Sequence, residues 1–340
     1  MSQNHPVREY FTSLLMICYL VSACSAMGTA PSKTEEIKVP VIVFTRTIGG
    51  IGLGDGRFIN PTDVCVDPNA GTSAGAPSIF VCDHGNNRVQ VFDKDWNFIR
   101  KFGSVGNLPG FFYDPWSIAV DRSSMVYVSD SGNSRVQKFT VDGRSVSAFG
   151  AQGFQPGKLK APTGITIGRM NDVLVADTGN HRIEDFDMSG SYISSRGIYG
   201  VALGSFNLPQ DVAVDRDNNI YVVDTRNHRV QIFYETVDTI DRIGKEGLKE
   251  GEFIEPKGIA VDENYIYVCD TGNNRVQVFS RVPVFGRVGK YLTSFGTYQM
   301  GEGRLSGPTG ITVTSDGRIF VADTNNNRIQ EYKLTFSANR

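Results

Sequence analysis

A six-residue pattern, Asp-x-x-Asn-x-Arg, recurs six times in the sequence and constrains the fold more than any other feature. Residues 177–182 (Asp-Thr-Gly-Asn-His-Arg) are one copy, and we call each copy a hexad. The six hexads end at Arg88, Arg135, Arg182, Arg229, Arg275 and Arg328. Successive arginines are 47, 47, 47, 46 and 53 residues apart. A regular period of this size predicts an array of repeated supersecondary units, as in propellers and solenoids.

Each repeat contains four short segments with the patterns of β-strands. A proline opens an alternating apolar run, as in residues 209–215, and a β-branched run such as residues 220–223 follows. The hexad forms a turn before a third run (residues 229–233), and a fourth run is exemplified by residues 145–149. Four short antiparallel strands per repeat are typical of a propeller blade. The sequence therefore predicts an all-β, six-bladed β-propeller of four-stranded antiparallel blades.

A link of constant length joins the fourth strand of each repeat to the proline of the next. Each link runs from a glycine, such as Gly103, to the proline 12 residues later, such as Pro115. A second glycine lies five residues before every proline, which indicates a backbone conformation that side chains disfavour. Two residues after it comes a Phe or Leu, which we expect to plug the space between blades. Strand order places the hexads and the links on one face, which we call the hexad face.

The last repeat ends after its third strand, at about residue 336, whereas residues 39–48 precede the first link as a fourth strand should. We therefore expect this N-terminal strand to pair with the last blade and close the ring, which removes exposed sheet edges. The predicted organisation is a leader (1–24), a flexible tether (25–38), the propeller (39–336) and a short C-terminal tail (337–340).

The leader has the layout of a secretory signal peptide. Residues 11–23 form an apolar run that is preceded by Arg8, followed by small residues and too short for a comfortable membrane span. Residues 21–24 (Val-Ser-Ala-Cys) also resemble a bacterial lipobox, in which Cys24 would carry a lipid anchor. The expected location is secreted or extracytoplasmic, with membrane attachment only through Cys24. A retained apolar tail is the alternative.

The cysteine count argues against a disulfide-stabilised domain, and the net charge argues against a nucleic-acid-binding domain. Cys65, Cys82 and Cys269 are the cysteines outside the leader, an odd number that is not a disulfide framework. They occupy positions where other repeats carry small residues, so we expect these cysteines to fill space in the buried core, with a Cys65–Cys82 disulfide as the alternative.

The formal net charge is −2, and basic and acidic residues alternate on the hexad face, so nucleic acid is not an expected partner.

The proline-led strand ending in Asp, the second strand ending in Asp, and Asn-x-Arg-(Val or Ile)-Gln before an aromatic residue resemble the NHL repeat family. His181 and His228 match that family's histidine position, and other repeats carry Asn or Ser there. The resemblance covers about residues 39–336 and implies a six-bladed propeller. It does not imply one activity, because relatives include RNA-binding, protein-interaction and sensor domains and a peptide-amidating lyase.

A specific site is expected where the sequence departs from the repeat, because a residue that is present six times more often builds the ring. The clearest departure is residues 108–116, with Phe111, Tyr113 and Trp116 at hexad-face positions. We predict that these aromatic residues form a binding patch, and local packing is the alternative. The polar rim of the patch is predicted to consist of Asp63, Gln210, Arg226 and Lys257.

The channel mouth offers an alternative site. Asp63 and Asp211 lie in blades one and four, opposite one another in a six-fold ring, where they could hold a cation. Two carboxylates without a ligand loop do not define a calcium site, and no proline-led strand carries a histidine near its start to suggest zinc. No catalytic residue, metal site or cofactor is therefore assigned.

The function expected from the sequence is an exported, non-enzymatic propeller scaffold that binds a protein or peptide, or a glycan, on the hexad face. A metal-dependent lyase or hydrolase with its site at the channel mouth is the first alternative. An RNA-binding NHL domain is the second.

Overall fold

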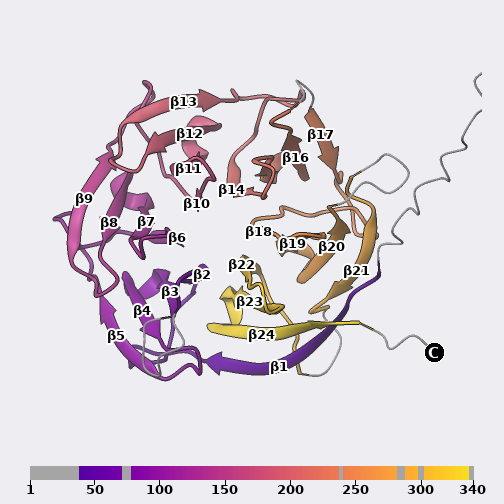
Figure 1. The fold of residues 1–340 in the computed structure, drawn as a ribbon, viewed down its shortest axis with the longest axis horizontal. Helices are drawn as coiled ribbons and strands as arrows, with labels where there is room; N and C mark the ends of the chain where they lie inside the picture. Colours follow the sequence, from indigo (N-terminus) through magenta and orange to yellow (C-terminus); the bar gives the residue numbers. More distant parts are fainter. Residues whose placement is uncertain (1–37, 71–77, 237–239, 282–287, 298–301, 337–340) are drawn as a thin grey trace, which may run out of the picture. The chain divides into compact units, whose positions relative to one another are not determined.

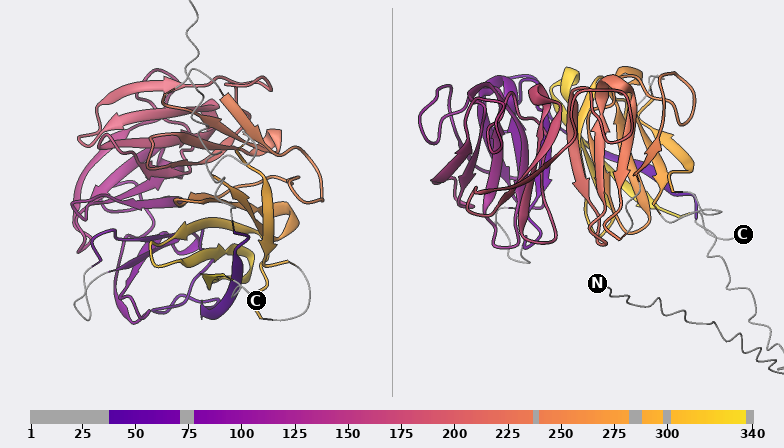
Figure 2. Two further views of the ribbon diagram at one scale, coloured as in Figure 1. Left: turned by 45° about the vertical axis from the view of Figure 1, so that its right-hand side comes forward. Right: turned by 90° about the horizontal axis from the view of Figure 1, so that it is seen from above.

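In the part of the chain that the structure describes, the repeats form 24 β-strands in six antiparallel sheets, each of four strands. The computed structural model describes residues 38–336 except 71–77, 237–239, 282–287 and 298–301. Figure 1 shows the sheets arranged as blades around a central axis, and Figure 2 shows them from two further sides. The predicted six-bladed propeller is confirmed. The leader, Cys24, the tether and the C-terminal tail lie outside the described residues.

The strands of the first three blades follow chain order from the axis outward. Blade 1 consists of β2 (Asp63–Val66), β3 (Ile79–Asp83), β4 (Arg88–Phe92) and β5 (Phe98–Phe102). Blade 2 consists of β6 (Pro115–Val120), β7 (Val126–Asp130), β8 (Arg135–Phe139) and β9 (Ser145–Gly150). Blade 3 consists of β10 (Ile165–Ile167), β11 (Asp172–Asp177), β12 (Arg182–Asp187) and β13 (Tyr192–Arg196).

The last three blades repeat this order, and the N-terminal strand completes the sixth. Blade 4 consists of β14 (Pro209–Val214), β15 (Ile220–Asp224), β16 (Arg229–Phe233) and β17 (Ile240–Ile243). Blade 5 consists of β18 (Ile259–Val261), β19 (Tyr265–Asp270), β20 (Arg275–Ser280) and β21 (Tyr291–Phe295). Blade 6 consists of β22 (Pro308–Val313), β23 (Arg318–Asp323), β24 (Arg328–Thr335) and β1 (Val41–Gly49).

Ring closure by the N-terminal strand is confirmed by the pairing of β1 with β24. Val41 lies opposite Thr335, and Gly49 lies opposite Arg328. The Phe44 ring packs edge-on against Tyr332, with centroids 5.9 Å apart. Because β24 begins at a hexad, this register places the start of β1 at the end of the ring opposite the hexad face.

Every hexad contains a three-residue 3-10 turn between the second and third strands. These turns are η1 (His84–Asn86), η2 (Ser131–Asn133), η3 (Thr178–Asn180), η4 (Thr225–Asn227), η5 (Thr271–Asn273) and η6 (Thr324–Asn326). The next residue has a left-handed backbone in each hexad, with φ between 51° and 58°. Asn and His tolerate this conformation better than most side chains do, which accounts for their use at this position.

The core lies between neighbouring blades rather than in one central mass. One cluster joins Phe80, Cys82 and Val91 of blade 1 to Phe112 and Ile118, which precede or belong to blade 2. The predicted plugs are confirmed, because all six link residues are at most 1% exposed: Phe58, Phe112, Leu159, Phe206, Phe253 and Leu305. The glycine that opens a link allows this packing, since a Cβ on Gly103 would lie 2.3 Å from the Phe112 ring.

The three cysteines outside the leader are free thiols, so the alternative of a Cys65–Cys82 disulfide is wrong. Cys82 and Cys269 are buried, as expected for small filler, whereas Cys65 is only partly buried. In the described residues, no helix is long and apolar enough to cross a membrane.

Candidate binding site at the mouth of the axial channel

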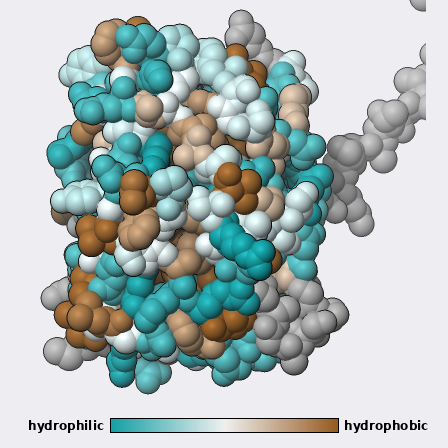
Figure 3. All heavy atoms as spheres, turned by 90° about the vertical axis from the view of Figure 1, so that its left-hand side faces the viewer, coloured by the Kyte–Doolittle hydropathy of each residue, from teal (hydrophilic) through white to brown (hydrophobic). Residues whose placement is uncertain are grey.

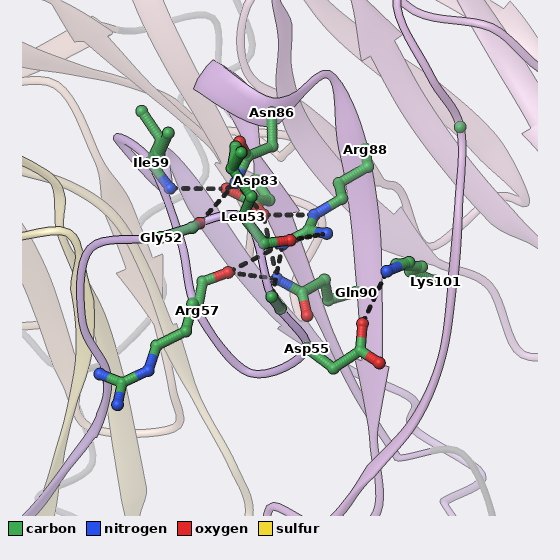
Figure 4. A network of polar contacts seen from close by, with 12 residues as sticks. Gly52, Leu53, Asp55, Arg57, Ile59, Asp83, Asn86, Arg88, Gln90 and Lys101 are labelled. Atoms are coloured by element: carbon green, nitrogen blue, oxygen red, sulfur yellow. Dashed lines mark hydrogen bonds and ion pairs between the residues drawn. The ribbon is translucent and has the colours of Figure 1, made fainter.

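The hexad residues form a buried polar network that ties each link to its own blade. In blade 1, Asp83 is fully buried, and its carboxylate accepts hydrogen bonds from the backbone N–H of Ile59 (2.9 Å), from Arg88 Nε (2.7 Å) and from Gln90 Nε2 (2.9 Å). Arg88 also donates to the link carbonyls, including that of Leu53 (2.8 Å). Figure 4 shows these bonds converging on Asp83. The pairing of the hexad Asp with the hexad Arg recurs in all six blades, so the network builds the ring.

The two histidines at the NHL histidine position hold neighbouring blades together. His181 Nδ1 accepts a hydrogen bond from the backbone N–H of Leu208 (3.1 Å), and His228 Nδ1 accepts one from Glu255 (3.1 Å). Each acceptor role places the proton of the neutral ring on Nε2. Burial lowers the pKa of His181, with Lys160 adding to this effect, so the neutral form is favoured. These contacts account for both histidines structurally.

Six residues, each third in a proline-led strand when the proline is counted first, surround the axis: Asp63, Ser117, Gly164, Asp211, Gly258 and Gly310. The Asp63 carboxylate accepts hydrogen bonds from Ser117 Oγ (2.6 Å) and from the backbone N–H of Ile118 (3.0 Å) in the next blade. Asp211 accepts from the backbone N–H of Ile259 (2.9 Å) in the same way. Two of the glycines make room for these side chains, because a Cβ on Gly164 would lie 2.3 Å from Asp211 Oδ1.

The two axial carboxylates are coupled electrostatically. Burial raises the pKa of Asp63 to about 6, although its bonds to Ser117 and to two backbone N–H groups oppose the shift. Burial and the charge of Asp63 raise the pKa of Asp211 well above its ordinary value. Both residues line an axial cavity of about 240 Å³, whose walls are the first strands of all six blades. The pair therefore resists carrying two full negative charges at once.

A second layer lies one residue nearer the hexad face. It consists of Thr62, Trp116, Thr163, Gln210, Lys257 and Thr309. The three threonines bond to the adjacent strands; Thr62 Oγ1, for example, donates to the carbonyl of Trp116 (2.6 Å). The other three residues break the repeat, and together with Asp63 and Asp211 they line a narrow space at the channel mouth.

Trp116 and Lys257 meet across this mouth, although they come from blades 2 and 5. Lys257 Nζ lies 5.8 Å from the centroid of the Trp116 ring, and the His84 ring packs edge-on against Trp116 at 5.4 Å. Burial lowers the pKa of Lys257, and the carboxylate of Glu255 opposes that shift. Gln210 Oε1 is buried without a hydrogen-bond partner. The mouth thus offers an aromatic surface, a cation and an unused acceptor within one small space.

The structure brings four of the seven predicted site residues to this mouth: Asp63, Trp116, Gln210 and Lys257. Phe111 and Tyr113 lie elsewhere on the link, with exposed fractions of 40% and 52%. Within the described residues neither ring makes an aromatic contact with Trp116, whose ring partner is His84. Arg226 is exposed and paired with Glu255 at 2.6 Å, which neutralises part of its charge.

Sequence reasoning missed exposed apolar side chains that recur at one position of the links. The residue four positions after the opening glycine is large and apolar in four links, and it is 72–77% exposed in each: Leu53, Phe154, Val201 and Leu248. Figure 3 shows apolar residues standing among polar ones on the side of the molecule that lies at the left of Figure 1. The regular spacing of these four residues is visible in the sequence, but only their exposure in the structure distinguishes them from the buried plug residues of the links.

The axial carboxylates remain a two-residue pair. No three His, Cys, Asp or Glu side chains in the described part of the chain lie close enough together to hold a metal ion. Their oxygens already accept backbone and hydroxyl hydrogen bonds. These bonds give both aspartates a role in joining blades.

Comparisons with known proteins agree with this architecture. A sequence model described as "NHL repeat" matches residues 112–139, 159–186, 206–233, 253–279 and 305–332. Protein lin-41 of Caenorhabditis elegans is 42% identical over 64 residues, and Protein brain tumor of Drosophila melanogaster is 31% identical over 90 residues. These alignments cover 19% and 26% of this chain but only 5% and 8% of the two relatives.

Solved structures show the same fold at low sequence identity. A streptogramin B lyase has a TM-score of 0.57 and 15% identity, with 88% of this chain and all of that chain covered. An auxiliary nutrient binding protein from Bacteroides ovatus has a TM-score of 0.61 and 11% identity, with 86% and 77% covered. These likenesses show the propeller fold alone, and the five matched repeats in a closed ring of six blades show that the chain is an NHL-repeat six-bladed β-propeller.

Proposed function

We propose that this protein is an exported, non-enzymatic scaffold that binds a peptide segment of a partner protein on its hexad face. The observation that carries the proposal is the convergence of Trp116, Gln210 and Lys257 on the axis. These residues come from three different blades, and each replaces the threonine that the other three blades use there. Departure from the repeat at one point in space favours a role beyond building the ring.

The chemistry of the mouth suits a peptide. Gln210 Oε1 is buried without a donor in the free protein, so a backbone N–H of the peptide would satisfy it after a side-chain rotation that exposes it. An apolar side chain would cover the exposed part of Trp116, and a carbonyl or carboxylate would pair with Lys257 Nζ. Phe111 and Tyr113 are exposed on the same face and offer further contact area beside the mouth. Other proteins of this fold include ones described as auxiliary nutrient binding proteins, which supports a binding role for the scaffold.

Export is proposed from the leader, with either cleavage or lipid attachment at Cys24. The described chain enters β1 at the end of the ring opposite the hexads, because Val41 pairs with Thr335 at the end of β24. An attachment at this end would leave the hexad face open to a partner. Mass spectrometry of the mature N-terminus tests this part of the proposal; an intact Met1 would contradict it.

Peptide display tests the binding proposal. The full-length protein is immobilised and used to select from a random peptide library, and an enriched peptide is then measured by fluorescence polarisation. Trp116→Ala should weaken binding at least about tenfold, since aromatic anchors at an interface contribute more than about 1 kcal/mol each. Phe336→Ala is the control, because it removes an aromatic ring that is 49% exposed just after β24, at the end of the ring opposite the hexad face.

Melting temperatures and a glycan array distinguish the possible outcomes of the binding experiment. Both variants should melt within a few degrees of the wild type, so that a loss of binding is not a loss of fold. Equal binding by wild type and Trp116→Ala would overturn the assignment of the mouth. Enrichment on a glycan array together with failure of the peptide selection would instead assign the site to a carbohydrate.

A further inference from the structure

One blade differs from the other five in a buried side chain next to the hexad. Two residues after the hexad arginine, five blades carry a buried glutamine: Gln90, Gln137, Gln231, Gln277 and Gln330. Blade 3 carries Glu184 at this position, and its side chain is 0% exposed. A carboxyl group replaces a carboxamide in the same buried setting.

Blade 4 shows what the glutamine does. Gln231 Oε1 accepts a hydrogen bond from the backbone N–H of Gly204 (2.9 Å). Its Nε2 donates to the link carbonyl of Ser205 (2.8 Å) and to Asp224 Oδ2 (3.1 Å). The amide nitrogen is therefore a required donor between two acceptors, and it holds the link against the hexad.

Glu184 reproduces only half of this arrangement. Its Oε2 accepts from the backbone N–H of Gly157 (3.0 Å), as the amide oxygen does elsewhere. Its Oε1 stands in for the amide nitrogen and is buried without a hydrogen-bond partner. Arg182 Nη2 is 2.7 Å away, but it donates to the link carbonyls of Gln155 (3.0 Å) and Lys158 (2.7 Å). The ionised carboxylate thus forms an ion pair with Arg182 through Oε1, but it has no proton to donate where the glutamine of the other blades donates to a link carbonyl and to the hexad aspartate.

We propose that Glu184 makes the third link of the hexad face a pH-responsive element. When protonated, Glu184 supplies the O–H donor that takes the place of the glutamine N–H, and the link is held as in the other blades. When deprotonated, Glu184 loses this donor and holds a buried charge next to the carboxylate of Asp177. The Arg182 ion pair and the Gly157 N–H offset that cost only in part, so the hold on residues 155–158 weakens. This link carries Phe154 and Lys158, so its release changes the surface that the hexad face presents.

The electrostatic surroundings place this change near neutral pH. Burial raises the pKa of Glu184 to about 7, and the nearby charge of Asp177 adds to the shift. The Gly157 N–H and the guanidinium of Arg182, on β12, oppose it. Asp177, at the end of β11, also has a raised pKa because of burial. The link contributes only backbone groups to this contact, so Asp177 and Arg182 are the charged neighbours that set the balance.

Amide hydrogen exchange of the full-length protein at Gly157 tests the proposal, because that N–H bonds directly to Glu184. The ratio of exchange rates between wild type and Glu184→Gln is measured from pH 6 to pH 8, which cancels the intrinsic pH dependence of exchange. This ratio should rise about tenfold across the range, as expected for one carboxyl group that titrates near pH 7. Glu184→Gln restores the side chain of the other five blades and is expected to fold.

A second variant introduces the buried carboxyl group into blade 4, at the position that corresponds to Glu184. Gln231→Glu should create the same pH-dependent exchange at Gly204 in blade 4. The side-chain carboxyl resonance of Glu184, assigned by its loss in Glu184→Gln, should titrate between pH 6 and pH 8. The resonances of Asp63, Asp185 and Asp211, whose pKa values burial also raises, should remain in that variant. A ratio that stays constant from pH 6 to pH 8 would overturn the proposal, as would a Glu184 resonance whose titration is complete below pH 6. If Gln231→Glu does not fold, the comparison of wild type with Glu184→Gln still shows whether Glu184 controls the exchange at Gly157.

Discussion

The most informative stability prediction concerns the hexad aspartate of blade 4, because it separates residues that build the ring from residues that bind. Asp224 is fully buried and accepts hydrogen bonds from the backbone N–H of Asn207 (2.7 Å), from Arg229 Nε (2.7 Å) and from Gln231 Nε2 (3.1 Å). The change Asp224→Ala removes this acceptor and leaves the buried Arg229 guanidinium without its carboxylate.

The size of the effect follows from that loss. Removing one partner of a buried ion pair costs about 3–5 kcal/mol. Arg229 keeps its hydrogen bonds to the carbonyls of Ala202 (2.7 Å) and Ser205 (3.1 Å), which places the expected loss at the lower end, about 3 kcal/mol. For a domain of this size, a loss of that order lowers Tm by roughly 6–12 °C.

Urea denaturation and calorimetry of the full-length variant measure this loss. Asp83→Ala in blade 1 is the matched comparison, because Asp83 makes the same bonds, and its loss should agree to within about 1 kcal/mol. Peptide binding at the mouth should persist in both variants at a temperature where they are folded. Unchanged stability would refute the structural role of the hexads, and a selective loss of binding would place the site on them instead.

Three further predictions follow from the same contacts. Removal of residues 1–48 deletes β1 and leaves β24 as an exposed edge, so gel filtration should show aggregates; a monomer with wild-type Tm would contradict the closure. Gly164→Ala places a Cβ against Asp211 Oδ1 and should cost about 1–3 kcal/mol by thermal denaturation, whereas an unchanged Tm would refute the tight axial packing. The folded-state pKa of Glu184, about 7, lies above its ordinary value of 4.5, so this group favours folding at low pH and loses that contribution as pH rises from 4.5 to 7. Glu184→Gln should therefore match wild type near pH 4.5 and be more stable by up to about 3 kcal/mol at pH 8 in urea titrations; equal stability at pH 8 would contradict the shift.

The fold could be predicted from the sequence because the repeat encodes it redundantly. Six hexads at regular spacing fix the number of blades, and the missing last strand identifies β1 as the closing strand. The plugs were predictable for the same reason, since a constant position in a link of constant length must meet the same packing in every blade.

The site was predictable only in part, because the position of a residue in the repeat does not determine which side chains it contacts. Phe111 and Tyr113 are close to Trp116 in sequence, yet each link travels across the hexad face to the axis, and Trp116 instead meets Lys257 of the opposite blade. The Glu184 substitution is visible in the sequence, but its consequence depends on burial and on the neighbouring acceptors. The Trp116–Lys257 contact and the unpartnered Glu184 oxygen could be found only in the three-dimensional structure, because both depend on which side chains lie close together in space.

The affinity of one display-selected peptide for three forms of the full-length protein, namely wild type, Trp116→Ala and Asp224→Ala, separates binding residues from residues that build the ring. We expect Trp116→Ala to weaken binding at least about tenfold with Tm nearly unchanged. Asp224→Ala should lower Tm while the folded protein still binds. The reverse pattern, with binding lost on removal of the hexad aspartate and retained without Trp116, would contradict the claim that the repeat builds the ring and its departures form the site.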